Sequence, residues 1–122
     1  LNDNLAGNFM LNAERKVVLV DFEYASNNDP HYDLALWFGE MFFTPEVERE
    51  MVEVYFGKAS QESLARVFIY KALADIKWSN WAWVQRQVSQ IEFDFHKYGL
   101  WKHMRARQFM QDPRWEEALR SV

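Results

Sequence analysis

The chain has 122 residues, a formal net charge of −4 at pH 7 and no cysteine. Its length predicts a single domain. The missing cysteine excludes disulfides and thiolate metal sites and favours a reducing, cytoplasmic location. Because Lys and Arg do not cluster, the composition argues against nucleic-acid binding. No apolar run approaches the ~20 residues that cross a bilayer, so we expect no membrane span.

Two short strands are expected near the start of the chain. Residues 1–8 are polar and predict a loop. The apolar segments Phe9–Leu11 and Val17–Val20 flank a polar turn and are rich in aromatic and β-branched residues, which predicts a hairpin. The valines of the second strand look buried, and Asp21 follows them directly.

The remainder of the chain is expected to be helical. Apolar spacing and turn signals predict five helices, over residues 31–43, 45–57, 60–90 and 91–110 and from Pro113 onward. Thr44 and Pro45 are start signals for the second helix, with Thr44 as its N-cap, and Gly57 ends it. Ser60 caps the third.

The third helix, residues 60–90, carries apolar residues around most of its circumference. A surface helix shows a single apolar stripe, so this one is predicted to be central and covered on several sides. The expected fold is therefore mainly α with a small N-terminal β-hairpin.

The first residues carry candidate chemistry, in the spacing Asp3-x-x-x-x-Asn8 with Asp21 behind the second strand. Phosphoryl transfer needs hard oxygen ligands for Mg²⁺ and a carboxylate that accepts the proton of the attacking hydroxyl. These three side chains supply both. Taken alone, the Asp and Asn residues are better explained as loop formers. The strand that ends in Asp21 reverses this balance, and the ordered combination favours the chemical interpretation.

The segments "NDNLAGN", "VVLVDFEYASNNDPHYDLALWFGE" and "WSNWAWVQRQVSQIEFDFHKYG" together resemble the choline and ethanolamine kinase family, within the group of aminoglycoside-phosphotransferase-like kinases. The resemblance spans residues 1–99. It implies the C-terminal lobe of a protein-kinase-like α+β fold, with ATP as co-substrate and Mg²⁺ as cofactor.

The resemblance also implies roles for individual residues. Asp3 looks like the catalytic base, and Asn8 and Asp21 look like the Mg²⁺ ligands that hold the ATP phosphates. Glu23 is similar to a family carboxylate near the metal and nucleotide. Asp33 is expected to brace the catalytic loop through hydrogen bonds. The amino-alcohol pocket of the family matches Tyr24, Glu40, Trp78, Trp81 and Tyr98.

Such a pocket has a physical basis. A quaternary ammonium donates no hydrogen bond, so its recognition needs aromatic faces within ~6 Å and a negative charge. Trp78 and Trp81 share one helix face, and Glu40 would supply the counter-charge as a buried, unpaired carboxylate. Aromatic residues at helical spacing are core residues far more often than ligand cages, and only the match to the family pattern favours a cage here. The other tryptophans are assigned to packing: Trp37, Trp83, Trp101 and Trp115.

Two departures from the family pattern matter. Leu1 stands where the family has a His that orders the loop. The resemblance starts at the catalytic loop, so the N-terminal lobe that clamps ATP is expected to be absent from this chain, and the chain alone is expected to be inactive.

Several functions stay open at this level. The substrate is choline, ethanolamine, thiamine or an aminoglycoside, and a pocket with one Glu favours a single cation. A non-catalytic pseudokinase or choline-binding module is the rival interpretation. A helical fragment that self-associates through exposed aromatic residues, for instance as a homodimer, is the third.

Overall fold

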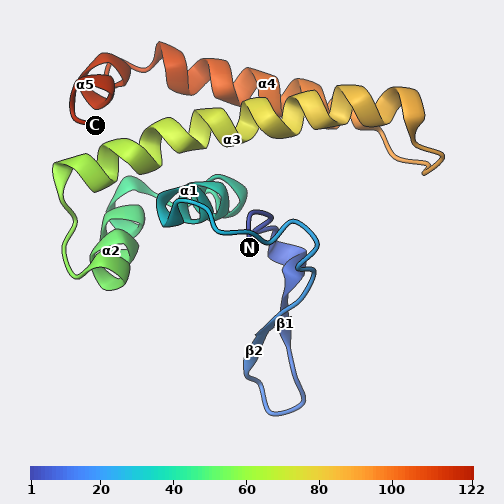
Figure 1. Ribbon diagram of the computed structural model, residues 1–122, viewed down its shortest axis with the longest axis horizontal. Helices are drawn as coiled ribbons and strands as arrows, with labels where there is room; N and C mark the ends of the chain where they lie inside the picture. Colours follow the sequence, from blue (N-terminus) through green and yellow to red (C-terminus); the bar gives the residue numbers. More distant parts are fainter.

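The computed structural model describes residues 1–122 as a small hairpin followed by five α-helices (Figure 1). The elements are the 3₁₀ turn η1 (Ala6–Asn8), β1 (Phe9–Leu11), β2 (Val17–Leu19), α1 (Pro30–Met41), α2 (Pro45–Phe56), α3 (Gln61–Val88), α4 (Phe95–Gln111) and α5 (Trp115–Arg120). The predicted fold class, mainly α with an N-terminal hairpin, is confirmed. None of the helices combines the length and the apolar character needed to cross a membrane.

Helix α3 is the axis of the helical body, as predicted. α4 returns antiparallel along it, α1 and α2 lie on its other side, and α5 packs near its start (Figure 1). Two clusters of buried side chains fill the interfaces: Leu34, Ala35, Phe38, Val52 and Val67 in one, and Tyr32, Leu36, Ala74 and Trp78 in the other. The cover is incomplete, because Leu73, Val84 and Val88 of α3 are exposed.

The helix ends differ from the sequence-based expectation in two places. Thr44 occupies the N-cap position of α2 but makes no capping bond with its side chain; only its carbonyl accepts, from the backbone N–H of Glu48. Helix α4 begins at Phe95 instead of residue 91, because the Asp94 carboxylate accepts from Lys97 N and caps the helix there.

The hairpin is less buried than its sequence suggested. Its strands pair antiparallel, with Phe9 opposite Leu19 and Leu11 opposite Val17, yet every residue of β2 is exposed. The hairpin projects away from the helices (Figure 1), and Phe9 at its base stacks on Trp37 of α1 with ring centroids 5.4 Å apart. The expectation of buried valines was therefore wrong for this chain. The assignment of Trp101 to packing was wrong as well, since its side chain is 53% exposed.

Gly99 permits the close approach of α4 to α3. A Cβ at this position would lie 3.1 Å from Ala82 Cβ, and the Gly99 carbonyl accepts from Ser79 Oγ at 2.9 Å.

Gly99→Val is expected to push the helices apart and to lower the free energy of unfolding by about 1–3 kcal/mol, measured by urea denaturation. The control is Gly7→Ala, where the added Cβ meets nothing within 4 Å; an equal loss in both variants would contradict the packing argument.

Candidate functional site

The polar loop at residues 1–4 is attached to the start of α1 by Asp33. Asp33 Oδ1 accepts from Asn2 N at 2.7 Å, and Oδ2 lies 2.6 Å from the Leu1 nitrogen. The Asp33 carbonyl accepts from Asn4 Nδ2 at 2.8 Å. One residue of α1 thus fixes the backbone nitrogens of Leu1 and Asn2 and holds the side chain of Asn4, so that Asp3 is presented from a constrained loop.

Asn2 ties the same loop to the segment after the hairpin. Its Nδ2 donates to the Tyr24 carbonyl and to Ser26 Oγ, and its Oδ1 accepts from Asn28 Nδ2. Asn2 is buried and has a φ of 64°. Asn tolerates this left-handed conformation better than most residues. Two segments that are separated by the hairpin therefore meet at the site.

Asp3 is buried, with 8% of its surface exposed. Burial raises the pKa of the Asp3 carboxyl, and the charges of Asp21, Glu40 and Glu23 raise it further, whereas the Lys77 ammonium opposes them. A carboxylate responds to these neighbours only when their charges lie within electrostatic reach. The structure thus gathers four of the acidic residues that the sequence singled out around one loop.

Asn8 and Asp21 flank the hairpin at its base. Asn8 is buried, its Nδ2 donates to the Asp3 carbonyl at 3.0 Å, and its backbone carbonyl accepts from Val20 N. The Asn8 Oδ1 accepts no hydrogen bond and is left for another partner. Asp21 is exposed and has a φ of 66°. An unusual backbone angle at a polar residue beside such a loop is typical of functional sites.

These two side chains offer hard oxygen atoms of the kind that Mg²⁺ prefers. The structure contains no group of three or more His, Cys, Asp or Glu side chains placed to hold a metal. Mg²⁺ usually takes one or two carboxylates and completes its shell with water and substrate phosphate. The free Asn8 oxygen and the Asp21 carboxylate fit that kind of site, and they do not fit a cage built from protein alone.

The aromatic residues predicted to form a pocket are connected in the structure. Their rings make successive edge-to-face contacts, with centroids 5.5 Å apart for Tyr24 and Trp78, 5.5 Å for Trp78 and Trp81, and 6.2 Å for Trp81 and Tyr98. The loop after the hairpin, α3 and α4 each contribute to this row of rings. Trp78 is buried, but 40% of Tyr24 is exposed, so one end of the row is open to solvent.

The Tyr32 hydroxyl and Trp78 Nε1 are buried beside this ring row, lie near each other without ideal hydrogen-bond geometry, and have no other partner. Burial raises the pKa of Tyr32 to about 12, with Asp33 and Asp3 adding to the shift. Burial also raises the pKa of Tyr98, and the charges of Glu40 and Asp3 act in the same direction. The charge of Asp3 in the polar loop therefore acts on both tyrosine hydroxyls. Both tyrosines stay neutral at physiological pH.

Glu40 differs from the expectation of a buried carboxylate without a partner. It is paired with the Lys102 ammonium and with Arg105 Nη2, the latter at 3.2 Å. Arg105 in turn makes a bidentate pair with Asp75, with both contacts at 2.6 Å, and donates to the Gly39 carbonyl. The counter-charge assigned to Glu40 is already balanced by two cations from α4.

Sequence reasoning missed several residues that shape this region: Tyr32, Asp75, Lys77, Lys102 and Arg105. One signal was available. Asp75 lies in the middle of a helix that is apolar nearly all round, and a buried carboxylate requires a cation. Arg105 is the cation that meets it, and the Arg105 side chain is only 11% exposed.

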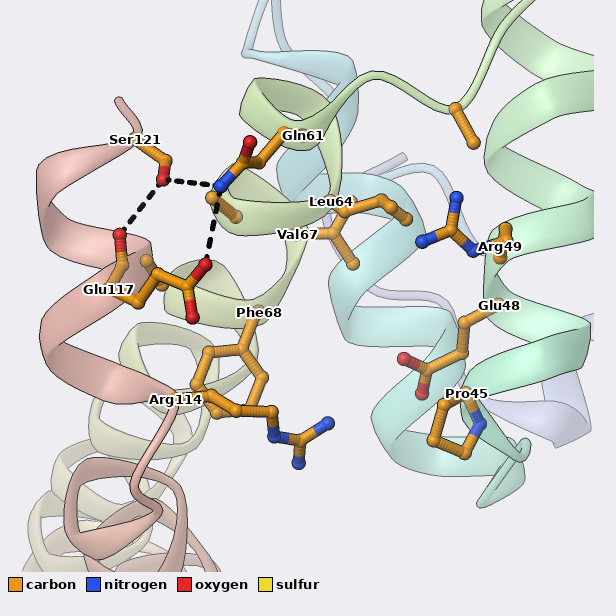
Figure 2. Close-up of a pocket in the computed structure, with 13 residues that line it drawn as sticks. Pro45, Glu48, Arg49, Gln61, Leu64, Val67, Phe68, Arg114, Glu117 and Ser121 are labelled. Carbon is orange, nitrogen blue, oxygen red and sulfur yellow. Dashed lines mark hydrogen bonds between the residues drawn. The ribbon is translucent and has the colours of Figure 1, made fainter.

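A separate pocket of about 600 Å³ lies between α2, α3 and α5 (Figure 2). Figure 2 shows hydrogen bonds among Gln61, Glu117 and Ser121 on one side of the pocket, with Glu48 and Arg49 across the opening. None of the predicted site residues lines it, and its lining contains no buried polar atom without a partner. The residues that the sequence singled out therefore lie at the Asp3 loop and the ring row, and not in this pocket.

The fold and the polar loop together define the helical lobe of a kinase-like protein. The family model for choline/ethanolamine kinase matches residues 1–107. A probable ethanolamine kinase from Arabidopsis thaliana is 34% identical over 80% of this chain and 31% of its own length, and probable choline kinase 2 from the same plant is 27% identical over 80% and 35%. The crystal structure of a choline/ethanolamine kinase family protein from Mesorhizobium loti superposes with a TM-score of 0.87 at 31% identity, covering 98% of this chain and 40% of the other.

The chain therefore belongs to the choline/ethanolamine kinase family, as the sequence motifs indicated. It spans about a third of the length of the curated relatives that it matches.

Proposed function

We propose that this chain is the substrate-binding and catalytic lobe of an ATP- and Mg²⁺-dependent kinase that phosphorylates the hydroxyl group of choline or a related amino alcohol. The observation that carries the proposal is the row of rings from Tyr24 to Tyr98, which lies within electrostatic reach of Asp3. Aromatic faces bind an ammonium group, and the same amino alcohol then offers its hydroxyl to the carboxylate.

In the proposed reaction, Asp3 accepts the proton of the substrate hydroxyl while the hydroxyl oxygen bonds to the γ-phosphorus of ATP. The bond from that phosphorus to the bridging oxygen breaks, and ADP leaves. Asn8 and Asp21 would hold Mg²⁺, which would neutralise charge on the phosphates, and Glu23 is proposed to act near the metal, because its charge acts on Asp3. Asp33 keeps the loop in place. The ATP-binding lobe is proposed to be a part of the kinase outside these residues.

Recognition of the substrate is proposed to depend mainly on the rings. Glu40 is balanced by Lys102 and Arg105, so its negative charge is only partly available. A quaternary ammonium is bound by aromatic faces alone, while a primary ammonium would also seek hydrogen-bond acceptors, and the Glu40 carboxylate is already paired. Choline is therefore the preferred candidate, and ethanolamine or thiamine is the alternative.

The test uses a polypeptide that joins this lobe to the nucleotide-binding lobe of a relative. ADP release with choline is expected to exceed that with ethanolamine or an aminoglycoside, and phosphocholine is expected as the product. Calorimetry on the 122-residue chain alone should show choline binding and no binding of Mg·ATP. If choline binds but no phosphate ester ever forms in the joined protein, the chain is a binding module and the proposed activity is refuted.

A further inference from the structure

A lysine of the chain occupies part of the row of rings. Lys77 Nζ lies 4.8 Å from the centroid of the Trp78 ring, 5.4 Å from that of Tyr32 and 5.6 Å from that of Tyr24. All three distances fall within the ~6 Å range in which a cation is attracted to an aromatic face. An ammonium group of the protein thus sits where the proposed function would place the ammonium group of the substrate.

This position is not explained by ion pairing. Three other lysines have carboxylate partners within 4.0 Å: Lys16, Lys71 and Lys102. Lys77 has none, and its ammonium also makes no hydrogen bond in the structure. The Asp3 carboxyl lies within electrostatic reach of Lys77 without pairing with it, so the contacts of the ammonium group are with the three rings, which come from the loop after the hairpin, α1 and α3.

The two lysines beside the rings differ in how firmly they are held. Lys102 Nζ lies 5.3 Å from the Tyr98 ring centroid, but it is 2% exposed and paired with Glu40. Lys77 is exposed, and its flexible four-carbon stem can carry the ammonium group back into water. Lys102 is thus a fixed part of the wall, whereas Lys77 can leave.

We propose that Lys77 is a tethered competitor that fills the open end of the ring row when no substrate is bound, and that it sets the affinity of the site for cationic amino alcohols. The proposal rests on the function proposed above. A substrate cation has to displace the Lys77 ammonium from Tyr24 and Trp78, so part of its binding free energy is lost in that exchange. Two cations also repel each other if both stay near the rings.

The contribution can be measured by removing the charge. Lys77→Met keeps the length and apolar stem of the side chain and deletes the ammonium group. An exposed cation–π contact of about 0.5–1 kcal/mol corresponds to about two- to fivefold in affinity. Choline and tetramethylammonium, titrated against the 122-residue chain with tryptophan fluorescence as the signal, are therefore expected to bind Lys77→Met about two- to fivefold more tightly than the unchanged chain.

Two further variants test the cause. Lys77→Arg keeps a cation that stacks on rings and is expected to bind choline as the unchanged chain does. Lys58→Met removes an exposed lysine that has no ring or carboxylate partner and serves as the matched control. In a chain whose lysines carry ¹³C-dimethyl groups, the Lys77 signal should be shifted upfield by the rings and should move toward the Lys58 signal as choline is added.

The outcomes separate the two proposals. Equal choline affinity in all four chains, or a Lys77 signal that does not move at saturating choline, overturns the competitor role and leaves the proposed function standing. If none of the chains binds choline or tetramethylammonium in a saturable manner, the proposed function fails and the competitor role fails with it. Tighter binding by Lys77→Met alone supports both.

Discussion

Asp3→Asn is expected to abolish phosphoryl transfer while leaving the fold intact. General-base catalysis typically contributes 10²–10⁴-fold, so kcat of the joined kinase should fall by about that factor. KM for the amino alcohol should change little, because the rings remain in place. The measurement is ADP release at saturating Mg·ATP, with product detected as the phosphate ester. A variant that keeps more than a tenth of the activity would show that another group takes the proton.

The stability of the Asp3→Asn chain provides an independent check. The pKa of Asp3 is raised in the folded state, so the folded chain binds this proton more tightly than the unfolded chain. Stability therefore falls as the pH rises from the ordinary pKa of an Asp through the raised one, and at pH 7 the ionised carboxylate is destabilising. The Asn variant removes this cost, and its unfolding midpoint at pH 7 should equal or exceed that of the unchanged chain. Glu50→Gln, an exposed carboxylate on α2, is the control.

The elements that the sequence predicted correctly depend on local signals. Ser60 caps α3 by accepting from Ser63 N, and Gly57 ends α2 with a φ of 80°. Both signals act within one helical turn. The hairpin follows from a short pattern of β-branched residues for the same reason. Local patterns leave only the ends uncertain, as the late start of α4 at Phe95 shows.

Burial was harder to predict, because it depends on what else packs nearby. Val17–Val20 form an apolar strand, and apolar strands are usually covered. The sequence does not say which surface would cover this one, and within residues 1–122 no other element does so. The same reason accounts for Trp101, whose apolar character fits a core position that the fold does not provide.

The charged groups of the site were missed because their partners are distant in sequence. Lys77 and Trp78 are adjacent in sequence, and neighbours on a helix do not face each other. Only the loop carrying Tyr24 and the helix carrying Tyr32 complete the ring site around the ammonium. The pairing of Glu40 with α4 likewise requires knowledge of how α1, α3 and α4 meet.

Arg105→Met is expected to be the most destabilising single change in the helical body. The substitution leaves Asp75, which is 1% exposed, without its bidentate partner, and it removes the donor to the Gly39 carbonyl. Although burial alone would lower the pKa of Arg105, the bonds to Asp75 and the charge of Glu40 raise it, so the guanidinium is fully charged. Removing one partner from a buried pair typically costs about 3–5 kcal/mol, a large part of the stability of a domain this size.

The free energy of unfolding should be measured by urea denaturation with circular dichroism. Arg120→Met is the matched control, because Arg120 pairs with Glu116 at 3.9 Å with both side chains exposed, and such pairs contribute about 0–1 kcal/mol. In the single variant the Asp75 carboxylate keeps only Lys102, at 3.7 Å, as a cation partner; the double variant Asp75→Leu/Arg105→Met replaces that carboxylate by an apolar side chain. The double variant should recover part of the free energy of unfolding that Arg105→Met loses. A double variant as unstable as the single one would mean that Arg105 stabilises the interface by packing, and the electrostatic explanation of the α1, α3 and α4 junction would have to be given up.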